Sequence, residues 1–84
     1  MSRDYYKKMN KIEFRKKLGL KIKLKRLELE LSQEDISTRA NFSLPFVSDI
    51  ECGKKGISLY YFIKLAKVLG LDFNSFLNEF DNLE

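Results

Sequence analysis

The stretch SQEDISTRANFSLPFVSDIECG, residues 32–53, decides the fold of this chain. Ser32 is a good N-cap, and Asp35, three residues on, suits the first turn of a helix that we expect over 33–40. Asn41 follows where the chain must turn sharply, and asparagine tolerates left-handed backbone angles better than most residues. The first half of the stretch therefore predicts a short helix that stops abruptly.

The second half of the stretch predicts another short helix. Ser43 caps it, we expect it over about 44–52, and Gly53 ends it. We expect Phe42, in the turn, to fill the space between the two helices. Apolar residues occupy positions 36, 40, 42, 47 and 50, with the small Ser37 where the helices would cross. This pattern is typical of a helix-turn-helix, a motif whose second helix reads the major groove of DNA.

Composition limits the other possibilities. The chain has 84 residues, 44% of them hydrophobic and 33% charged, which indicates one small globular domain. It has no histidine and a single cysteine, so we expect no disulfide, no metal site, no cofactor and no catalytic site. It also has no apolar run near 20 residues and no secretory signal pattern. We therefore expect a cytoplasmic, nucleoid-associated protein of a bacterial or phage-infected cell.

The net charge of +4 is unevenly distributed. Residues 1–30 hold eleven Lys/Arg against four Asp/Glu, whereas residues 31–84 hold five against eight. Basic charge concentrated at one end suits contact with a phosphate backbone, because neutralised phosphates release condensed counterions.

The remaining segments predict further helices and no strand. An amphipathic helix with a basic flank is expected over 18–31, a helix capped by Ser58 and stopped by Gly70 over 58–69, and a final helix over 72–80. Together these elements make a compact, all-α fold of five helices.

The domain boundaries follow from these helices. We expect the helix-turn-helix domain over 17–80 and a short tail over 81–84. Residues 1–16 are either a basic N-terminal arm or an extension of the first helix, and their irregular apolar spacing favours the arm.

Several short motifs resemble the lambda-repressor/Cro-like helix-turn-helix domains of phage repressors, plasmid regulators and restriction–modification controller proteins. They are LG at 18–19, Arg26, LSQEDI at 31–36, FS at 42–43, VSDIE at 47–51, Gly53 and LAKVLGLD at 65–72. The resemblance covers roughly residues 18–77. It implies five helices, a two-fold dimer on double-stranded DNA, and half-sites roughly 34–36 Å apart, each read by the third helix.

The resemblance also implies roles for individual residues. Those expected at DNA phosphates or along the sugar–phosphate wall are Lys25, Gln33, Ser43, Phe46, Lys54 and Lys55. Those expected to face base edges are Leu44, Pro45, Ser48 and Asp49. Arg26 and Glu51 match the partly buried ion pair that ties the first helix to the third in this family.

The recognition positions depart from the family pattern at Leu44 and Pro45, where relatives usually carry polar or basic residues. Neither side chain can form the bidentate hydrogen bonds that discriminate guanine or adenine, although both can pack on a thymine methyl. Ser48 can bond several base edges, and Asp49 can accept from cytosine. Specificity then leans on DNA shape or on the N-terminal arm. The alternative is a protein-binding module, of antitoxin or antirepressor type, that uses an apolar face of Leu44, Pro45 and Phe46.

The last helix carries more large apolar surface than a small core needs, which predicts a homodimer. We expect Phe76, Phe80 and Leu83 at the dimer contact, whereas Phe73 and Leu77 are as well explained by core packing. The sequence thus predicts a dimeric transcription regulator on a (pseudo)palindromic operator, either a compact repressor or a restriction–modification controller protein, and not an enzyme.

Overall fold

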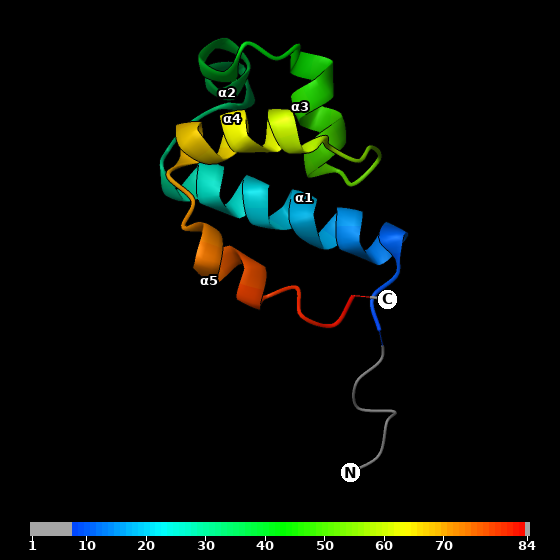
Figure 1. Cartoon of the computed structure of the whole chain (residues 1–84). Coiled ribbons are helices and arrows are strands. Elements are labelled where there is room, and N and C mark those ends of the chain that lie inside the picture. The colour runs from blue at the N-terminus through cyan, green and yellow to red at the C-terminus, as the bar shows by residue number, and fades with distance from the viewer. Residues whose placement is uncertain (1–7, 84) are drawn as a thin grey trace.

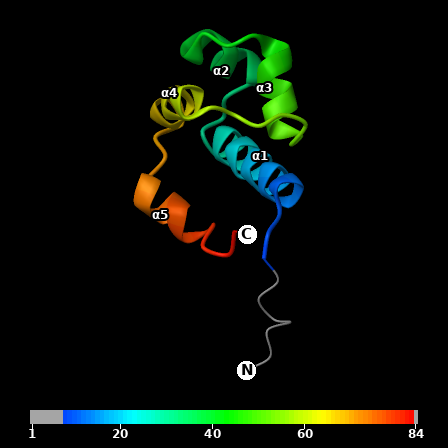
Figure 2. The ribbon, with the colours of Figure 1, turned by 45° about the vertical axis from the view of Figure 1, so that its right-hand side comes forward.

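A computed structural model describes residues 8–83, and this part of the chain consists of helices, turns and loops with no strand. The elements are α1 (Lys11–Glu28), α2 (Gln33–Ala40), α3 (Leu44–Glu51), α4 (Leu59–Leu69) and α5 (Phe73–Asn78). The long α1 runs between the α2–α3 pair and α5 (Figures 1 and 2). The all-α fold of five helices that the sequence predicts is confirmed. None of the helices in residues 8–83 is both long and apolar enough to cross a bilayer.

Local sequence sets the limits of α2. The Ser32 hydroxyl accepts a hydrogen bond from the Asp35 backbone N–H at 2.9 Å, and the Asp35 carboxylate accepts one from the Ser32 N–H at 2.8 Å. These hydrogen bonds, the backbone one foremost, hold the pKa of Asp35 below its ordinary value. Asn41 then adopts left-handed angles, φ 56° and ψ 50°, which end the helix. The N-cap Ser32 and the turn residue Asn41 are thus where the sequence predicts them, and Asp35 completes a capping box.

The turn between α2 and α3 is fastened from within. The Ser37 hydroxyl donates to the Phe42 backbone carbonyl. Phe42 itself is buried between the two helices, as the sequence predicts. All five apolar positions expected to lock the motif are buried: Ile36, Ala40, Phe42, Val47 and Ile50. They form one core with residues of α1 and α4, so α2 and α3 are held rigidly on the rest of the domain.

The first helix begins earlier than expected, at Lys11 rather than near Leu18. Asn10 is the reason, because its side chain accepts a hydrogen bond from the Glu13 N–H at 2.9 Å and so caps the helix. Residues 11–16 are therefore helical, and they do not form the extended arm that the sequence favoured. Residues 1–7, the rest of the expected arm, lie outside the described residues, as does Glu84 at the end of the expected tail.

The added turns of α1 are packed against the end of the chain. The ring of Phe14 meets the ring of Phe80 edge-on, with 5.0 Å between their centroids. The Met9 N–H donates to the Asn82 carbonyl at 2.8 Å, and Met9 pairs with Leu83 in a single parallel bridge. The last helix is also shorter than predicted, because α5 ends at Asn78 and the chain then turns back to bring Phe80 into the core.

Candidate nucleic-acid interface

The first turn of α3 is presented on the surface. The Ser43 hydroxyl caps the helix by accepting from the Phe46 N–H at 3.2 Å, and Pro45 stands in the first turn, where a missing N–H costs nothing. Leu44 is 41% exposed and Pro45 is exposed as well, whereas Val47 and Ile50 anchor the opposite face. The geometry therefore leaves the start of α3 free to contact a partner while its back is fixed to the core.

A buried ion pair fixes the far end of α3 to α1. Arg26 Nε lies 2.7 Å from Glu51 Oε2, and Arg26 Nη2 lies 3.0 Å from Glu51 Oε1. Both residues are buried, and this hydrogen bonding raises the pKa of Arg26. Arg26 Nη1 also donates to the Leu31 carbonyl at 2.8 Å. The structure thus brings Arg26 and Glu51 together as the resemblance implied, and the pair positions α3 on α1.

The start of α2 is tied to the same carboxylate. Gln33 Nε2 donates to Glu51 Oε1 at 3.0 Å, so the side chain of Gln33 is held in one orientation. Its second amide hydrogen and its carbonyl oxygen are not used by this bond. Gln33 is therefore preorganised beside α3, in a position suited to a phosphate contact at the α2 N-terminus.

Asp49 on α3 is paired with a lysine from the following loop. Lys55 Nζ lies 3.4 Å from Asp49 Oδ2. This contact offsets the negative charge that Asp49 would otherwise present to a phosphate backbone. Lys54, next to it, is exposed, and no acidic side chain of residues 8–83 lies within ion-pair distance of it.

Lys25 does not join this group. It lies within 3.7 Å of Glu28 and lines a surface depression with Leu71 and Phe76, on the side of α1 that faces α5. The structure thus places Lys25 away from α3, because positions 25 and 26 point to different sides of the helix. Arg26 faces α3, and Lys25 faces α5.

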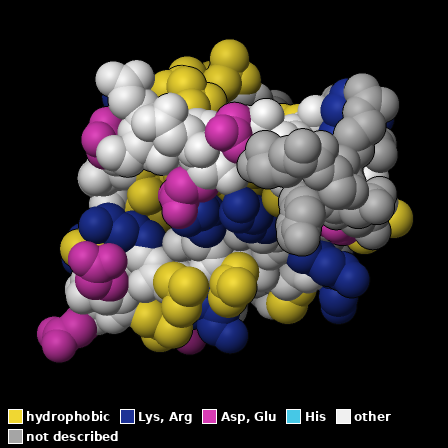
Figure 3. Space-filling model, turned by 90° about the horizontal axis from the view of Figure 1, so that it is seen from below, with side chains coloured by type: hydrophobic (Ala, Val, Ile, Leu, Met, Phe, Trp, Pro, Cys, Tyr) yellow, Lys and Arg dark blue, Asp and Glu magenta, His cyan; other side chains and the backbone are white. Residues whose placement is uncertain are grey.

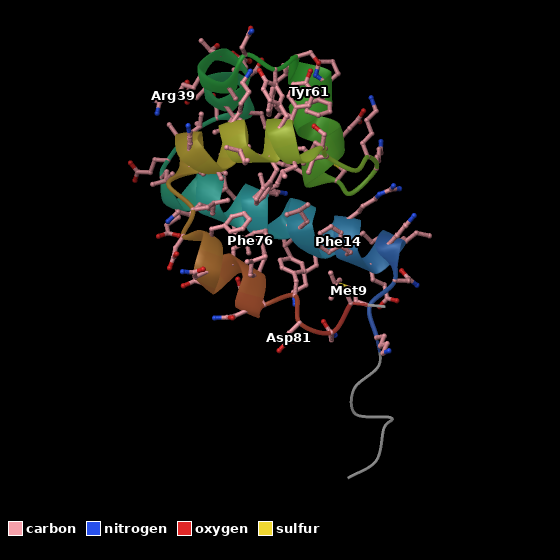
Figure 4. All side chains as sticks on the ribbon, in the orientation of Figure 1. Met9, Phe14, Arg39, Tyr61, Phe76 and Asp81 are labelled. Atoms are coloured by element: carbon pink, nitrogen blue, oxygen red, sulfur yellow. The ribbon has the colours of Figure 1, made fainter. Side chains whose placement is uncertain are left out.

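Phe46 is partly buried by contacts with two other aromatic rings. Its ring lies 5.2 Å from Phe42 and 5.7 Å from Tyr61 on α4, both edge-on. Figure 4 shows Tyr61 beside α3. The exposed apolar surface at the start of α3 is thus supplied mainly by Leu44 and Pro45. The contribution of the largest side chain to the protein-binding alternative is correspondingly smaller.

Two residues of α4 belong to the same surface, and neither was among the expected DNA contacts. Tyr61 packs on the turn, and Lys64 Nζ lies 5.4 Å from the Phe42 ring and 5.9 Å from the Tyr61 ring. Their spacing along α4 puts positions 61 and 64 on one face, which is the signal that could have identified them. Lys64 thus adds a positive charge behind the turn.

The residues expected at the dimer contact are not the ones most exposed in this region. Phe80 is only 7% exposed and belongs to the core, and Phe76 packs between Phe62 and Phe80, with centroids 5.2 and 5.0 Å away. Within one subunit, Phe80 therefore fills the core and not the surface. Phe73 and Leu77 instead reach the surface, at 45% and 51% exposure. The helical repeat does not distinguish these residues, because the turn after Asn78 reverses the chain.

The exposed apolar residues border an open groove between α1, α4 and α5, which we call the apolar groove. It has a volume of about 320 Å³ and no charged residue lines it. Its exposed rim consists of Leu59, Phe73, Leu77 and Leu83. Among residues 8–83, no three His, Cys, Asp or Glu side chains come together in a way that could hold a metal ion.

Comparison with known proteins agrees with this geometry. A comparison with curated proteins gave no match. A family model described as helix-turn-helix matches residues 22–76, which is more than half of the chain and includes α2, α3 and α4 entire. The chain therefore belongs to the Cro/C1-type helix-turn-helix family, which is a family of DNA-binding transcription regulators.

Proposed function

We propose that this protein is a sequence-specific transcription regulator that binds a (pseudo)palindromic operator as a homodimer in the cytoplasm, as restriction–modification controller proteins and compact repressors do. The observation that carries the proposal is the network of Arg26, Glu51 and Gln33, which holds α2 and α3 in one orientation. With the back of α3 locked, its exposed first turn can enter a major groove as a rigid body.

Base recognition in this proposal is mostly apolar. Leu44 and Pro45 pack on thymine methyl groups, and Ser48 donates to or accepts from a base edge. Asp49 is held by Lys55, which reduces its repulsion from the backbone. None of these contacts is a bidentate hydrogen bond, which would contribute about 1–3 kcal/mol of discrimination. Each half-site is therefore read weakly, so DNA shape and the second subunit supply much of the specificity.

Replacing Lys54 with alanine tests the proposed DNA surface. Each lost phosphate contact reduces the slope of log K against log salt by about 0.9, so we expect a reduction of about 2 for a dimer. Gln33→Ala should weaken binding as well, because it removes the side chain preorganised at the α2 N-terminus. Fluorescence anisotropy on a labelled duplex, repeated over a salt series, measures both effects.

The matched control is Lys25→Ala, which removes the same charge from the side of α1 that faces α5. It should leave the slope unchanged. Equal effects of Lys54→Ala and Lys25→Ala would contradict the proposed surface, since the binding would then depend only on net charge.

The second subunit is proposed to dock at the apolar groove. The groove offers concave and convex apolar surface side by side, without a charge that a second copy would have to pair. A two-fold interface requires such a self-complementary patch, because each subunit must supply both the knob and the hole. Leu77 and Phe73 are the convex elements on α5. On the face seen from below, hydrophobic side chains form separate groups with Lys and Arg side chains between them (Figure 3).

Leu77→Glu is expected to produce a monomer, because two glutamates would then face each other across the two-fold axis in an apolar contact. Sedimentation equilibrium measures the change in dimer dissociation constant, which should rise at least 100-fold. Leu27 on α1 is equally exposed, at 50%, and Leu27→Glu should leave the dimer intact. Dissociation by Leu27→Glu but not by Leu77→Glu would place the interface on α1 and refute the assignment to the groove.

A further inference from the structure

The loop between α3 and α4 lies directly against the first turns of α1. A Cβ atom added at Gly53 would come within 2.8 Å of the Lys16 Cα, and one at Gly56 would lie 3.3 Å from Arg15 Nε. Gly53 has a φ of +74°, which allows the chain to turn here without a side chain between loop and helix. The early start of α1 at Lys11 is what brings Arg15 and Lys16 to this loop.

Four basic residues therefore flank this contact between helix and loop, and we call them the loop-flanking basic surface: Arg15, Lys16, Lys54 and Lys55. Lys55 is paired with Asp49. Within residues 8–83, no acidic side chain lies within ion-pair distance of the other three. Lys16 and Lys54 are exposed, and Arg15 is half-buried against Gly56. The surface thus carries several positive charges that the domain itself does not neutralise.

Three other lysines of α1 behave differently. Lys17 Nζ donates to the Glu79 carbonyl at 2.7 Å, Lys21 forms an ion pair with Glu79, and Lys25 lies beside Glu28. All three lie on the side that faces α5, where Lys21 and Lys25 have an acidic partner and Lys17 is held by a backbone carbonyl. Within residues 8–83, Arg15 and Lys16 have no such acidic partner. An uncompensated cluster of this kind costs free energy through mutual repulsion unless an anionic partner binds it.

We infer that the loop-flanking basic surface binds backbone phosphates of the same DNA molecule that α3 contacts, and so lengthens the footprint of each subunit. The inference rests on the proposed function, because it requires α3 to be at the DNA. It goes beyond the family match, which begins at residue 22 and excludes Arg15 and Lys16. DNA is favoured over another anion because the surface continues from the end of α3 through Lys54 and Lys55.

The double variant Arg15→Gln/Lys16→Gln tests this inference. The probe is a labelled random-sequence duplex of roughly 30 base pairs, long enough for two half-sites and their flanks. We expect the slope of log K against log salt to fall by about 2 per subunit, since two phosphate contacts are lost. Lys21→Gln/Lys25→Gln removes the same charge from the same helix on the α5 side, and it should leave the slope unchanged. Lys16→Gln alone alters only an exposed side chain and should give about half of the effect.

The outcomes separate the two proposals. Wild-type binding that Arg15→Gln/Lys16→Gln and Lys16→Gln leave unaltered would overturn the inference and leave the proposed function standing. Equal losses in Arg15→Gln/Lys16→Gln and Lys21→Gln/Lys25→Gln would also overturn it, because the effect would then reflect net charge. If the wild-type protein failed to bind the duplex at every salt concentration tested, the proposed function would be contradicted, and the inference with it.

Discussion

Replacing Arg26 with methionine is expected to lower the free energy of unfolding by about 3–5 kcal/mol, because it leaves the Glu51 carboxylate buried without its partner. The total stability of a domain of this length is about 4–13 kcal/mol, so a loss of this size is a large fraction of it. The loss also frees the Leu31 carbonyl and the end of α3. Urea unfolding followed by circular dichroism measures the change.

The double variant Arg26→Met/Glu51→Leu distinguishes a stranded charge from lost packing. Replacing a buried ion pair by apolar residues of similar volume is often neutral or stabilising, so the double variant should recover most of the stability that Arg26→Met loses. It should still bind DNA more weakly than the wild type, because the Gln33 amide would lose its acceptor on Glu51. A loss below about 1 kcal/mol for Arg26→Met would show that the pair behaves as an exposed one, contrary to its burial.

Replacing Gly19 with alanine is expected to lower the free energy of unfolding by about 2 kcal/mol or more. In the middle of a helix, alanine normally stabilises the helix by up to about 1 kcal/mol relative to glycine. Here the added Cβ would stand 2.3 Å from the Ile50 carbonyl oxygen and 2.6 Å from that of Glu51, both backbone atoms that cannot swing aside. Overpacking of this kind costs about 1–3 kcal/mol or more, so the clash outweighs the propensity.

Thermal unfolding shows whether Gly19→Ala stabilises or destabilises the domain, since a loss of this size lowers the Tm of a small domain by roughly 8–16 °C. Leu20→Ala, at the exposed neighbouring position, is the control and should change the Tm little. A raised Tm for Gly19→Ala would mean that α1 and α3 are further apart than this structure has them. Because α3 must then tilt, Gly19→Ala should also weaken DNA binding.

The parts of the fold that depend on neighbouring residues could be predicted from the sequence. Ser32, Asn41 and Ser43 act within three or four residues of themselves, so their capping and turning roles follow from residue type and spacing. The α1 start was missed although its signal is equally local. Asn10 followed three residues later by Glu13 is a helix-start pattern. The irregular apolar spacing after it favoured an arm instead of a helix.

The parts that depend on long-range packing could not be predicted in the same way. Lys25 and Arg26 are both basic residues of one helix, and residue type alone does not tell which of them is buried with Glu51, so the pairing with Arg26 came from the family resemblance. Phe73 and Phe80 are equally apolar, and a turn after Asn78 buries one and exposes the other. The contact of Arg15 and Lys16 with the loop at 53–56 likewise arises from tertiary structure alone.

The measurement that tests the central claim most directly is selection of the purified wild-type protein on random-sequence duplex DNA at about 150 mM salt. We predict enrichment of a two-fold symmetric motif whose half-sites are centred about 10 base pairs apart, with thymines at the positions that Leu44 and Pro45 face. A bound pool without any enriched motif would contradict sequence-specific recognition, and the absence of a bound pool would contradict DNA binding itself.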